Sequence, residues 1–225
     1  MNPLYDNIKW VWLDLDDTLY DFQAASLIAL GKVHSDLELS RFFRSADEWI
    51  DIYHRHNSAL WKLYNRAEIT KEFLKMERFR RPLVEAGADD ATARRLSMQL
   101  DPLYLDLLGR AGCTIPGAIE LLQSLHSNGF KVGILSNGFT EVQHKKLLSS
   151  GIAPYTDCVV LSDEIGINKP DRRLFDYALK KAGTTASASL MIGDNPDTDI
   201  AGATAAGWRA RLFNPAEDSL YALLP

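Results

Sequence analysis

An apolar run that ends in clustered acids constrains this chain more than any other feature. The stretch WLDLDDTLYD, residues 12–21, leads a strand-like segment directly into Asp14, Asp16 and Asp17. Two carboxylates about 4 Å apart repel each other by about 1 kcal/mol in water and by about 4 kcal/mol at an effective dielectric constant near 20. We therefore expect a cation to lie among these acids.

The composition is that of an ordinary soluble globular protein. The chain has 225 residues, 46% of them hydrophobic, which is enough for one sizeable core and a second, smaller domain. Its formal charge is -5 and it has no basic tract, so we expect no nucleic acid polymer as a partner. No run approaches membrane-spanning length and the first residues lack a secretory pattern, so we expect no membrane partner and a cytoplasmic location. Cys113 and Cys158 lack CxxC spacing and are predicted to be reduced, buried thiols, which fits that location.

Beyond residue 111 the sequence alternates between strand and helix periods, as is typical of a parallel sheet with crossover helices. The expected strands are residues 8–15, 131–136, 158–161, 190–193 and 209–213. The expected helices are residues 117–127, 141–149, 172–182 and 198–206.

Between the first strand and the others, apolar residues recur at helical spacing. The stripes comprise Leu27, Leu30, Val33 and Leu37; Trp49, Ile52, Tyr53, His56, Leu60, Leu63 and Tyr64; Phe73, Met76, Phe79 and Leu83; and Leu96, Leu100, Leu103 and Leu107. The sequence therefore predicts an α/β core domain of residues 1–21 and 112–225, interrupted by a helical domain of residues 22–111.

Polar residues stand at or after the ends of the expected strands, and in an open parallel sheet ligands bind beyond the carboxyl ends of the strands. These residues are Asp14, Asp16, Ser136, Asn137, Lys169, Asp194 and Asp199. Carboxylate oxygens favour a hard cation, and Mg²⁺ needs few carboxylates beside a substrate phosphate. A serine hydroxyl and a lysine ammonium suit phosphate oxygens. On an extended chain Asp14 and Asp16 would project to the same side and Asp17 away from it. The pattern predicts phosphoryl transfer at a Mg²⁺ site.

Four segments resemble the motifs of the haloacid dehalogenase superfamily, in order and at fitting spacing: DLDDT at residues 14–18, Ser136 at the end of an apolar strand, Lys169 followed by Pro170, and GDNPDTD at residues 193–199. The resemblance implies a Rossmann-like, doubly wound parallel sheet with an inserted helical cap domain. LWKLYNRAEIT, SNGFTEVQHKKL and DEIGINKPD are further similar to the bacterial pyrimidine 5′-nucleotidase subgroup, although Arg66-Ala67 stands where that subgroup usually has Gly.

The resemblance also implies roles for individual residues. Asp14 would be the nucleophile that forms an aspartyl-phosphate, and Asp16 would protonate the leaving oxygen and later deprotonate water. Mg²⁺ would be held by the Asp14 carboxylate, the Asp16 main-chain oxygen and Asp194, with Asp199 as a further ligand or a residue behind the ligands. Ser136, Asn137 and Lys169 would bind phosphate, and Thr18 would brace the loop. The dehalogenases of the superfamily lack an acid at the position of Asp16, which favours phosphate ester hydrolysis.

Other polar residues have simpler interpretations. Asp17 and Asp21 are interpreted as solvated or loop-capping residues, and Asp197 equally as a helix N-cap, so all three stay outside the predicted site. Asn137 is at even odds a turn residue, and Gly138 is interpreted as one.

In the helical segment His54 and His56 are two apart and cannot face one another, so they are not expected to bind a metal. Trp49, Trp61 and Tyr64 at helical spacing are interpreted as core of the helical domain rather than as a platform for a base. Tyr20 and Phe22, at the root of the helical segment, are the candidates for direct substrate contact.

The predicted function is hydrolysis of small phosphomonoesters, with nucleoside 5′-monophosphates as the first choice of substrate. A sugar phosphomutase uses the same aspartyl-phosphate and returns the phosphoryl group to a bound intermediate. A catalytically silent binding protein is also compatible with the fold, although the paired acids argue against it.

Overall fold

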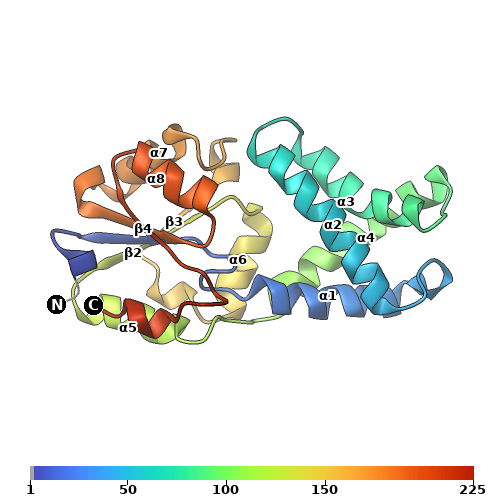
Figure 1. The fold of residues 1–225 in the computed structure, drawn as a ribbon, viewed down its shortest axis with the longest axis horizontal. Coiled ribbons are helices and arrows are strands. Elements are labelled where there is room, and N and C mark those ends of the chain that lie inside the picture. Colours follow the sequence, from blue (N-terminus) through green and yellow to red (C-terminus); the bar gives the residue numbers. More distant parts are fainter. Residues whose placement is uncertain (1–2) are drawn as a thin grey trace. The chain divides into compact units, whose positions relative to one another are not determined.

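A computed structural model describes residues 3–225 of the chain, and these fall into two compact units. The α/β unit comprises the chain up to Gln23 together with Gly112–Pro225, and the helical unit comprises Ala24–Ala111. Figure 1 shows the sheet of the former and the helices of the latter. Among the described residues no helix is both long and apolar enough to span a membrane.

The α/β unit is built on one parallel sheet of five strands in the order β3-β2-β1-β4-β5. The strands are β1 (Trp10–Leu13), β2 (Lys131–Ser136), β3 (Cys158–Leu161), β4 (Ser189–Gly193) and β5 (Arg209–Leu212). The predicted parallel α/β fold is confirmed, and β2 and β3 have the predicted bounds. Because β1 is central, with β2 on one side and β4 on the other, the strand order reverses at the carboxyl end of β1. That reversal is where open α/β sheets bind ligands.

Helices cover both faces of this sheet (Figure 1). They are α5 (Ala118–Ser127), α6 (Thr140–Ser149), α7 (Arg172–Ala182) and α8 (Ala201–Ala205). One core lies between the sheet and α7 and α8, and it is lined by Trp12, Leu135, Val160, Leu174, Phe175, Ala178, Met191, Ala203, Ala206 and Trp208. Burial on both faces explains why the central strands are continuous apolar runs rather than alternating ones.

The first strand, Trp10–Leu13, is shorter than the predicted 8–15 at both ends, and at its carboxyl end this is because the chain turns after Asp14. The Asp14 amide still donates to Ile192 O at 2.9 Å, which extends the ladder by one residue. The Leu15 carbonyl then accepts from the amides of Leu19 and Tyr20 at 3.0 and 2.8 Å, bonds of a turn rather than of a sheet. Asp17 has a left-handed backbone with φ 55°, a conformation that Asp adopts more readily than most residues. The turn lifts residues 15–20 out of the sheet.

The predicted helix 198–206 is also different in the structure. A π turn spans Pro196–Ile200, and α8 begins only at Ala201. Asn195 is the N-cap, since its side chain accepts from the amides of Asp197 and Thr198 at 3.0 Å each. The interpretation of Asp197 as the N-cap was therefore wrong, because the amide side chain of Asn195 already occupies that position.

The helical unit contains α2 (Ala46–Asn65), α3 (Lys71–Glu85), α4 (Asp90–Arg110) and most of α1 (Phe22–Asp36). Side chains of Ser45, Thr70 and Asp89 accept from backbone amides three residues later and so fix where α2, α3 and α4 begin. Its core holds buried aromatic rings, with Tyr53 and Phe79 stacked at 5.0 Å between centroids. Trp49 belongs to this core, as predicted.

Two predicted stripe residues do not belong to the core. Leu27 is 50% exposed and Phe73 is 43% exposed. The buried face of α1 is instead lined by Ala25, Ala29, Leu30 and Val33, and Leu27 lies away from that face. In the turn after α2, Ala67 has a left-handed φ of 56°, so the chain keeps a glycine-like backbone at the place where Gly is usual.

Candidate active site

Asp14 stands directly after β1, at the point where the strand order reverses. The residue is 8% exposed, and the hydrogen bond from its amide to Ile192 O ties it to β4. A carboxylate that is nearly buried must be paired or protonated, because desolvation disfavours its charge. The partners of Asp14 therefore decide its state.

Lys169 supplies the first partner. Its ammonium donates to Asp14 Oδ1 and to Leu135 O, both at 2.7 Å, and pairs with Asp199 Oδ1 at 2.6 Å. Burial opposes the charge of this lysine, but Asp14 and Asp199 outweigh it and raise its pKa above the usual value. Lys169 therefore has two hydrogen-bond acceptors and a second carboxylate in ion-pair contact. Lys169 is thus a fixed positive charge that links the ends of three segments.

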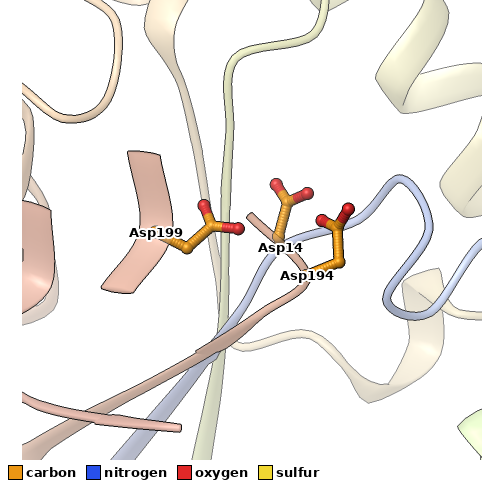
Figure 2. Close-up of side chains that lie close together, drawn as sticks. All are labelled: Asp14, Asp194 and Asp199. Carbon is orange, nitrogen blue, oxygen red and sulfur yellow. The ribbon is translucent and has the colours of Figure 1, made fainter. Parts of the chain in front are cut away.

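A metal-capable cluster is formed by Asp14, Asp194 and Asp199. Each offers a carboxylate oxygen, and these oxygens all lie within 4.8 Å of one another. Figure 2 shows the three side chains converging from the ends of β1 and β4 and from the π turn. An all-oxygen donor set suits a hard divalent cation such as Mg²⁺. The residues present fit the predicted metal.

The acidity of the cluster supports the same fit. Burial raises the pKa of Asp14 well above its usual value, and the neighbouring carboxylates raise it further against the lowering effect of Lys169. Burial and the nearby Asp199 raise the pKa of Asp194 to about 7. Without a metal, one ammonium does not balance these acids, and the cluster relieves its repulsion by holding a proton. A divalent cation would take the place of that proton.

Asp199 is held from two sides. Oδ1 pairs with Lys169, and Oδ2 accepts from the Asn195 amide at 3.1 Å. The residue is 1% exposed. Both oxygens therefore already have protein partners, which favours the alternative that Asp199 stands behind the metal ligands and holds Lys169 in place.

Gly193 leaves room for Asp199. A Cβ at this position would meet Asp199 Oδ2 at 2.3 Å and Asp199 Cγ at 2.5 Å. Distances this short cannot be relieved without moving a carboxylate that is fully buried and doubly held. The end of β4 therefore needs glycine for packing, not for backbone freedom.

We expect Gly193→Ala to displace Asp199 and lower the free energy of unfolding by about 1–3 kcal/mol, as overpacking does. Hydrolytic activity should fall with it, because Lys169 loses a partner. Gly31→Ala is the matched control, because a Cβ at this position in α1 would meet no described residue within 4 Å beyond the adjoining backbone of its own helix. Thermal unfolding of both variants tests this, and a Gly193→Ala protein as stable and active as Gly31→Ala would contradict it.

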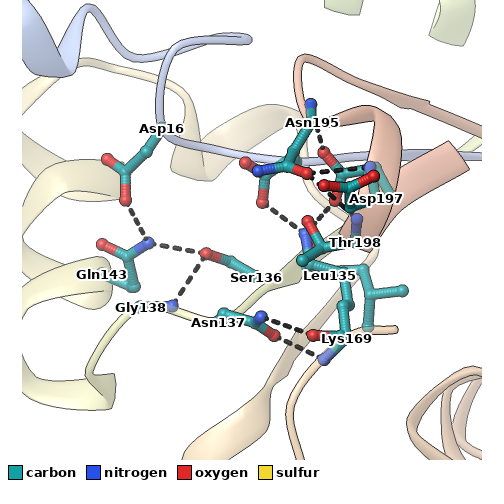
Figure 3. Close-up of polar contacts among 12 residues, drawn as sticks. Asp16, Leu135, Ser136, Asn137, Gly138, Gln143, Lys169, Asn195, Asp197 and Thr198 are labelled. Carbon is teal, nitrogen blue, oxygen red and sulfur yellow. Dashed lines mark hydrogen bonds and ion pairs between the residues drawn. The ribbon is translucent and has the colours of Figure 1, made fainter. Parts of the chain in front are cut away.

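Asp16 lies in the turn that follows β1. The turn after β1 directs its side chain toward α6 (Figure 3). Asp16 Oδ1 accepts from Lys146 Nζ at 2.6 Å and Oδ2 accepts from Gln143 Nε2 at 2.9 Å. Because β1 ends before Asp16, the turn rather than the strand sets the direction of this side chain, and a common side for Asp14 and Asp16 stays a prediction.

Ser136 and Asn137 stand at the end of β2, next to Lys169. Ser136 Oγ accepts from Gln143 Nε2 at 2.8 Å and from the Gly138 amide at 3.2 Å. The Asn137 side chain accepts from the Lys169 amide at 2.7 Å and donates to Lys169 O at 3.0 Å. This paired contact is visible in Figure 3. The side chain of Asn137 therefore positions Lys169, and phosphate contact by its backbone stays a prediction.

The remaining predicted residues lie in or near the turn. Thr18 is fully buried, and its Oγ1 has no hydrogen-bond partner among the residues described. Tyr20 is also fully buried, and Phe22 is half-buried. The ammonium of Lys146 lies 5.3 and 5.2 Å from the centres of their two rings. Direct substrate contact by Tyr20 and Phe22 stays a prediction.

Residues that were kept out of the site have structural contacts. Asp17 accepts from the Gln23 amide at 3.3 Å and so caps the start of α1. His56 pairs with Glu85 at 2.7 Å. Cys113 and Cys158 form no disulfide among the described residues, and both are half-buried rather than buried.

Gln143 and Lys146 are functional candidates that the sequence interpretation missed. Both lie on the buried face of α6, together with Val142 and Leu147. A signal was present: a glutamine and a lysine at i and i+3, flanked by apolar residues of the same helical face, just after a candidate phosphate-binding serine. Polar side chains on a buried face need partners.

Comparison with known proteins agrees with this geometry. Residues 8–207 match the haloacid dehalogenase-like hydrolase family. The chain belongs to this family. It is 32% identical to pyrimidine 5′-nucleotidase YjjG of Escherichia coli over 89% of this chain and 84% of that protein. It is 31% identical to pyrimidine 5′-nucleotidase PynA of Streptococcus pneumoniae over 92% of this chain and 84% of that protein.

A solved structure is similar over nearly the whole length. The hydrolase YfnB of Bacillus subtilis, crystallised with magnesium, superposes with a TM-score of 0.83 at 28% identity. The superposition covers 94% of this chain and 91% of that one. The recognition of the family from its four motifs is thereby confirmed.

Proposed function

We propose that the protein is a Mg²⁺-dependent phosphatase that hydrolyses small phosphomonoesters through an aspartyl-phosphate on Asp14. The observation that carries the proposal is the buried Asp14, held by Lys169 inside a cluster of carboxylates that fits a metal. The helical unit, residues 24–111, is proposed to act as the cap domain.

Charge balance supports a divalent cation at this site. Two lysines, Lys146 and Lys169, contact the carboxylates of Asp14, Asp16 and Asp199. The carboxylate of Asp194 lies beside those of Asp14 and Asp199, which makes four acids in all. With every group charged, the excess is about the two negative charges that one divalent cation neutralises. Asp14 and Asp194 would hold the ion, with Asp199 and Lys169 fixing their positions. When bound, Mg²⁺ would neutralise phosphate charge and align the phosphorus for attack.

In the proposed mechanism an Asp14 carboxylate oxygen attacks phosphorus, and the bond to the leaving oxygen breaks. Asp16, which must enter the cycle in its protonated form, gives its proton to that oxygen, which leaves as an alcohol. Asp16 then takes a proton from water, the water oxygen attacks phosphorus, and the bond to Asp14 breaks to free inorganic phosphate. Lys169 lowers the repulsion between two anions at the moment of attack. Every proton is returned, so the protein ends as it began.

Nucleoside 5′-monophosphates are the proposed substrates. The support is the similarity to two pyrimidine 5′-nucleotidases over more than four fifths of each chain. A relative at 30% identity, from Thermus thermophilus, is a phosphoserine phosphatase, so phosphate esters of other alcohols belong in the test.

A phosphate-release screen tests the proposal. We expect free phosphate from pyrimidine nucleoside 5′-monophosphates with Mg²⁺, and at least about tenfold lower kcat/KM for sugar phosphates and phosphoserine, equivalent to about 1.4 kcal/mol of discrimination. Activity on every substrate should be lost without a divalent cation. An Asp14→Asn protein, prepared in parallel, controls for contaminating phosphatases.

The other outcomes distinguish the alternatives. An isomerised sugar phosphate with little free phosphate would support a phosphomutase. No phosphate from any ester in the panel, at any Mg²⁺ concentration, would leave a binding protein on this fold and would contradict the proposal.

A further inference from the structure

We propose that Gln143 and Lys146 on α6 are positioning residues for the phosphatase reaction, which hold Asp16 for proton transfer and aim the Ser136 hydroxyl at the phosphate. The inference rests on the proposed function and assigns roles to two side chains outside the four sequence motifs. Both belong to the α/β unit, as do all their partners discussed below.

The side chains of Gln143 and Lys146 donate to both carboxylate oxygens of Asp16. Lys146 Nζ donates to Oδ1 at 2.6 Å, and Gln143 Nε2 donates to Oδ2 at 2.9 Å. A carboxylate held at both oxygens has one orientation rather than several. Asp16 lies in a turn outside the sheet, so its orientation depends on α6 and not on β1.

Lys146 is buried in a way that packing alone does not require. Its side chain is 3% exposed, and its ammonium lies against the rings of Tyr20 and Phe22 at 5.3 and 5.2 Å. An ammonium loses its hydration when it is buried, and aromatic faces return only part of that loss. A methionine would fill similar space without this cost. The charge is therefore explained by its carboxylate partner, Asp16.

Gln143 links the two polar groups of the reaction. One Nε2 contacts both Asp16 Oδ2 and Ser136 Oγ, at 2.9 and 2.8 Å. In its ionised form the Asp16 carboxylate can only accept, so the amide nitrogen must face it, and this fixes the orientation of the amide. The two protons of Nε2 then serve two different acceptors. Gly138 leaves space for the amide, since a Cβ there would meet Nε2 at 2.2 Å.

The same contacts determine what Ser136 can do. Its oxygen accepts from Gln143 Nε2 and from the Gly138 amide at 3.2 Å. A hydroxyl oxygen has two lone pairs and one proton. With both lone pairs used by donors from α6 and from its own turn, the hydroxyl proton remains for an acceptor such as a phosphate oxygen. Gln143 thus makes Ser136 a donor.

The test compares leaving groups. Departure of a ribose alkoxide needs a proton from Asp16, whereas 4-nitrophenolate leaves without one. For both substrates kcat/KM reports the steps up to release of the alcohol or phenol, which is when Asp16 acts as the acid. We expect Lys146→Met to lower kcat/KM about 10²-fold on the best nucleoside monophosphate and less than about fivefold on 4-nitrophenyl phosphate. Asp16→Asn should give the same pattern with a larger loss.

Matched variants separate positioning from folding. Lys145→Met removes an exposed lysine of the same helix and should leave both substrates unchanged. Lys146→Arg keeps the charge and should recover most of the kcat/KM on the nucleoside monophosphate that Lys146→Met loses. Gln143→Leu should also lower kcat/KM more on the nucleoside monophosphate than on 4-nitrophenyl phosphate. Because Ser136 loses a partner, this variant should in addition raise KM about tenfold for both substrates, equivalent to about 1.4 kcal/mol.

Three outcomes would overturn the proposal. Equal losses on the two substrates for Lys146→Met and for Gln143→Leu would indicate a merely structural role. Unchanged kinetics in both variants would show that Asp16 is positioned without α6. If the wild-type protein released no phosphate from either ester, the proposed function itself would fall, and this inference with it. Thermal unfolding of each variant confirms that the losses are measured on folded protein.

Discussion

Asp14→Asn is expected to lower kcat for phosphate release by about 10⁴-fold or more, because an amide cannot replace the attacking carboxylate. The substitution keeps the shape of the side chain. It also removes one negative charge from a cluster whose acids already repel one another, since the pKa of Asp14 is raised well above its usual value. The variant should therefore stay folded, and the loss should lie in the chemical step.

The matched control is Asp17→Asn. Asp17 lies three residues further along, contacts Gln23 and has no assigned role in the reaction. Its φ of 55° is one that Asn adopts readily. Activity should stay within a few-fold of the wild-type value. An Asp14→Asn protein with activity within tenfold of the Asp17→Asn protein would remove Asp14 from the mechanism.

The covalent intermediate can be observed directly. Wild-type protein quenched in acid during turnover should carry phosphate on the peptide that contains Asp14, and the label should be released by hydroxylamine, as expected of an acyl phosphate. The Asp14→Asn peptide should carry none. Phosphate found on a different residue would contradict the assignment even if the variant were inactive.

Removing divalent cations is expected to abolish activity and to destabilise the protein in a pH-dependent way. In the metal-free folded state the pKa of Asp194 is about 7, against an ordinary value of 3.8. Between these two values the folded protein binds more protons than the unfolded chain. The contribution of Asp194 to the free energy of unfolding of the metal-free protein therefore falls as pH rises from about 4 to about 7, and this destabilisation is fully present above pH 7.

Mg²⁺ should reverse this effect most strongly where the acids are ionised. At 100 times its dissociation constant a ligand adds about 2.7 kcal/mol, which corresponds to about 5–10 °C in Tm for a chain of this size. We expect a gain of that order at pH 8 and a clearly smaller one at pH 5.5, measured by thermal unfolding with Mg²⁺ or EDTA. Activity with EDTA should drop about 10³-fold or more and return with added Mg²⁺.

Asp194→Asn separates the metal from a general salt effect. Without metal at pH 8 this variant should be more stable than the wild type, because it lacks one of the repelling carboxylates. Added Mg²⁺ should then change its Tm by little. The metal site would be in doubt if the wild type and Asp194→Asn gained equally, or if the wild-type gain did not depend on pH.

Much of the α/β unit was predictable from the sequence alone. The segments at β2, β3 and α7 have the predicted bounds because each is an unbroken apolar or amphipathic run between turn residues. A strand covered on both faces has no outward-facing polar positions, so its apolar run is not interrupted. The carboxyl end of β1 and the start of α8 were less predictable, because hydrogen bonds of Leu15 and Asn195 decide them and apolar periodicity does not.

The candidate site was only partly predictable for a related reason. Asp14, Lys169 and Asp194 follow strands or precede helices that the sequence identifies, so their meeting follows from the topology. Gln143 is 127 residues from Asp16, and no local pattern in either segment indicates that the two side chains are in contact. The exposed Leu27 was predicted to be buried because periodicity indicates a stripe without saying which side of it faces the core.

The sequence by itself determined the family, the parallel sheet and the identity of the acids that gather at its edge, because apolar periodicity and short motifs are local properties of a chain. Only the tertiary structure decided that Lys169 is shared by Asp14 and Asp199, and that Asp16 contacts Lys146 of α6. These are contacts across long stretches of sequence, and burial sets their strength: the same charges in water would attract one another only weakly.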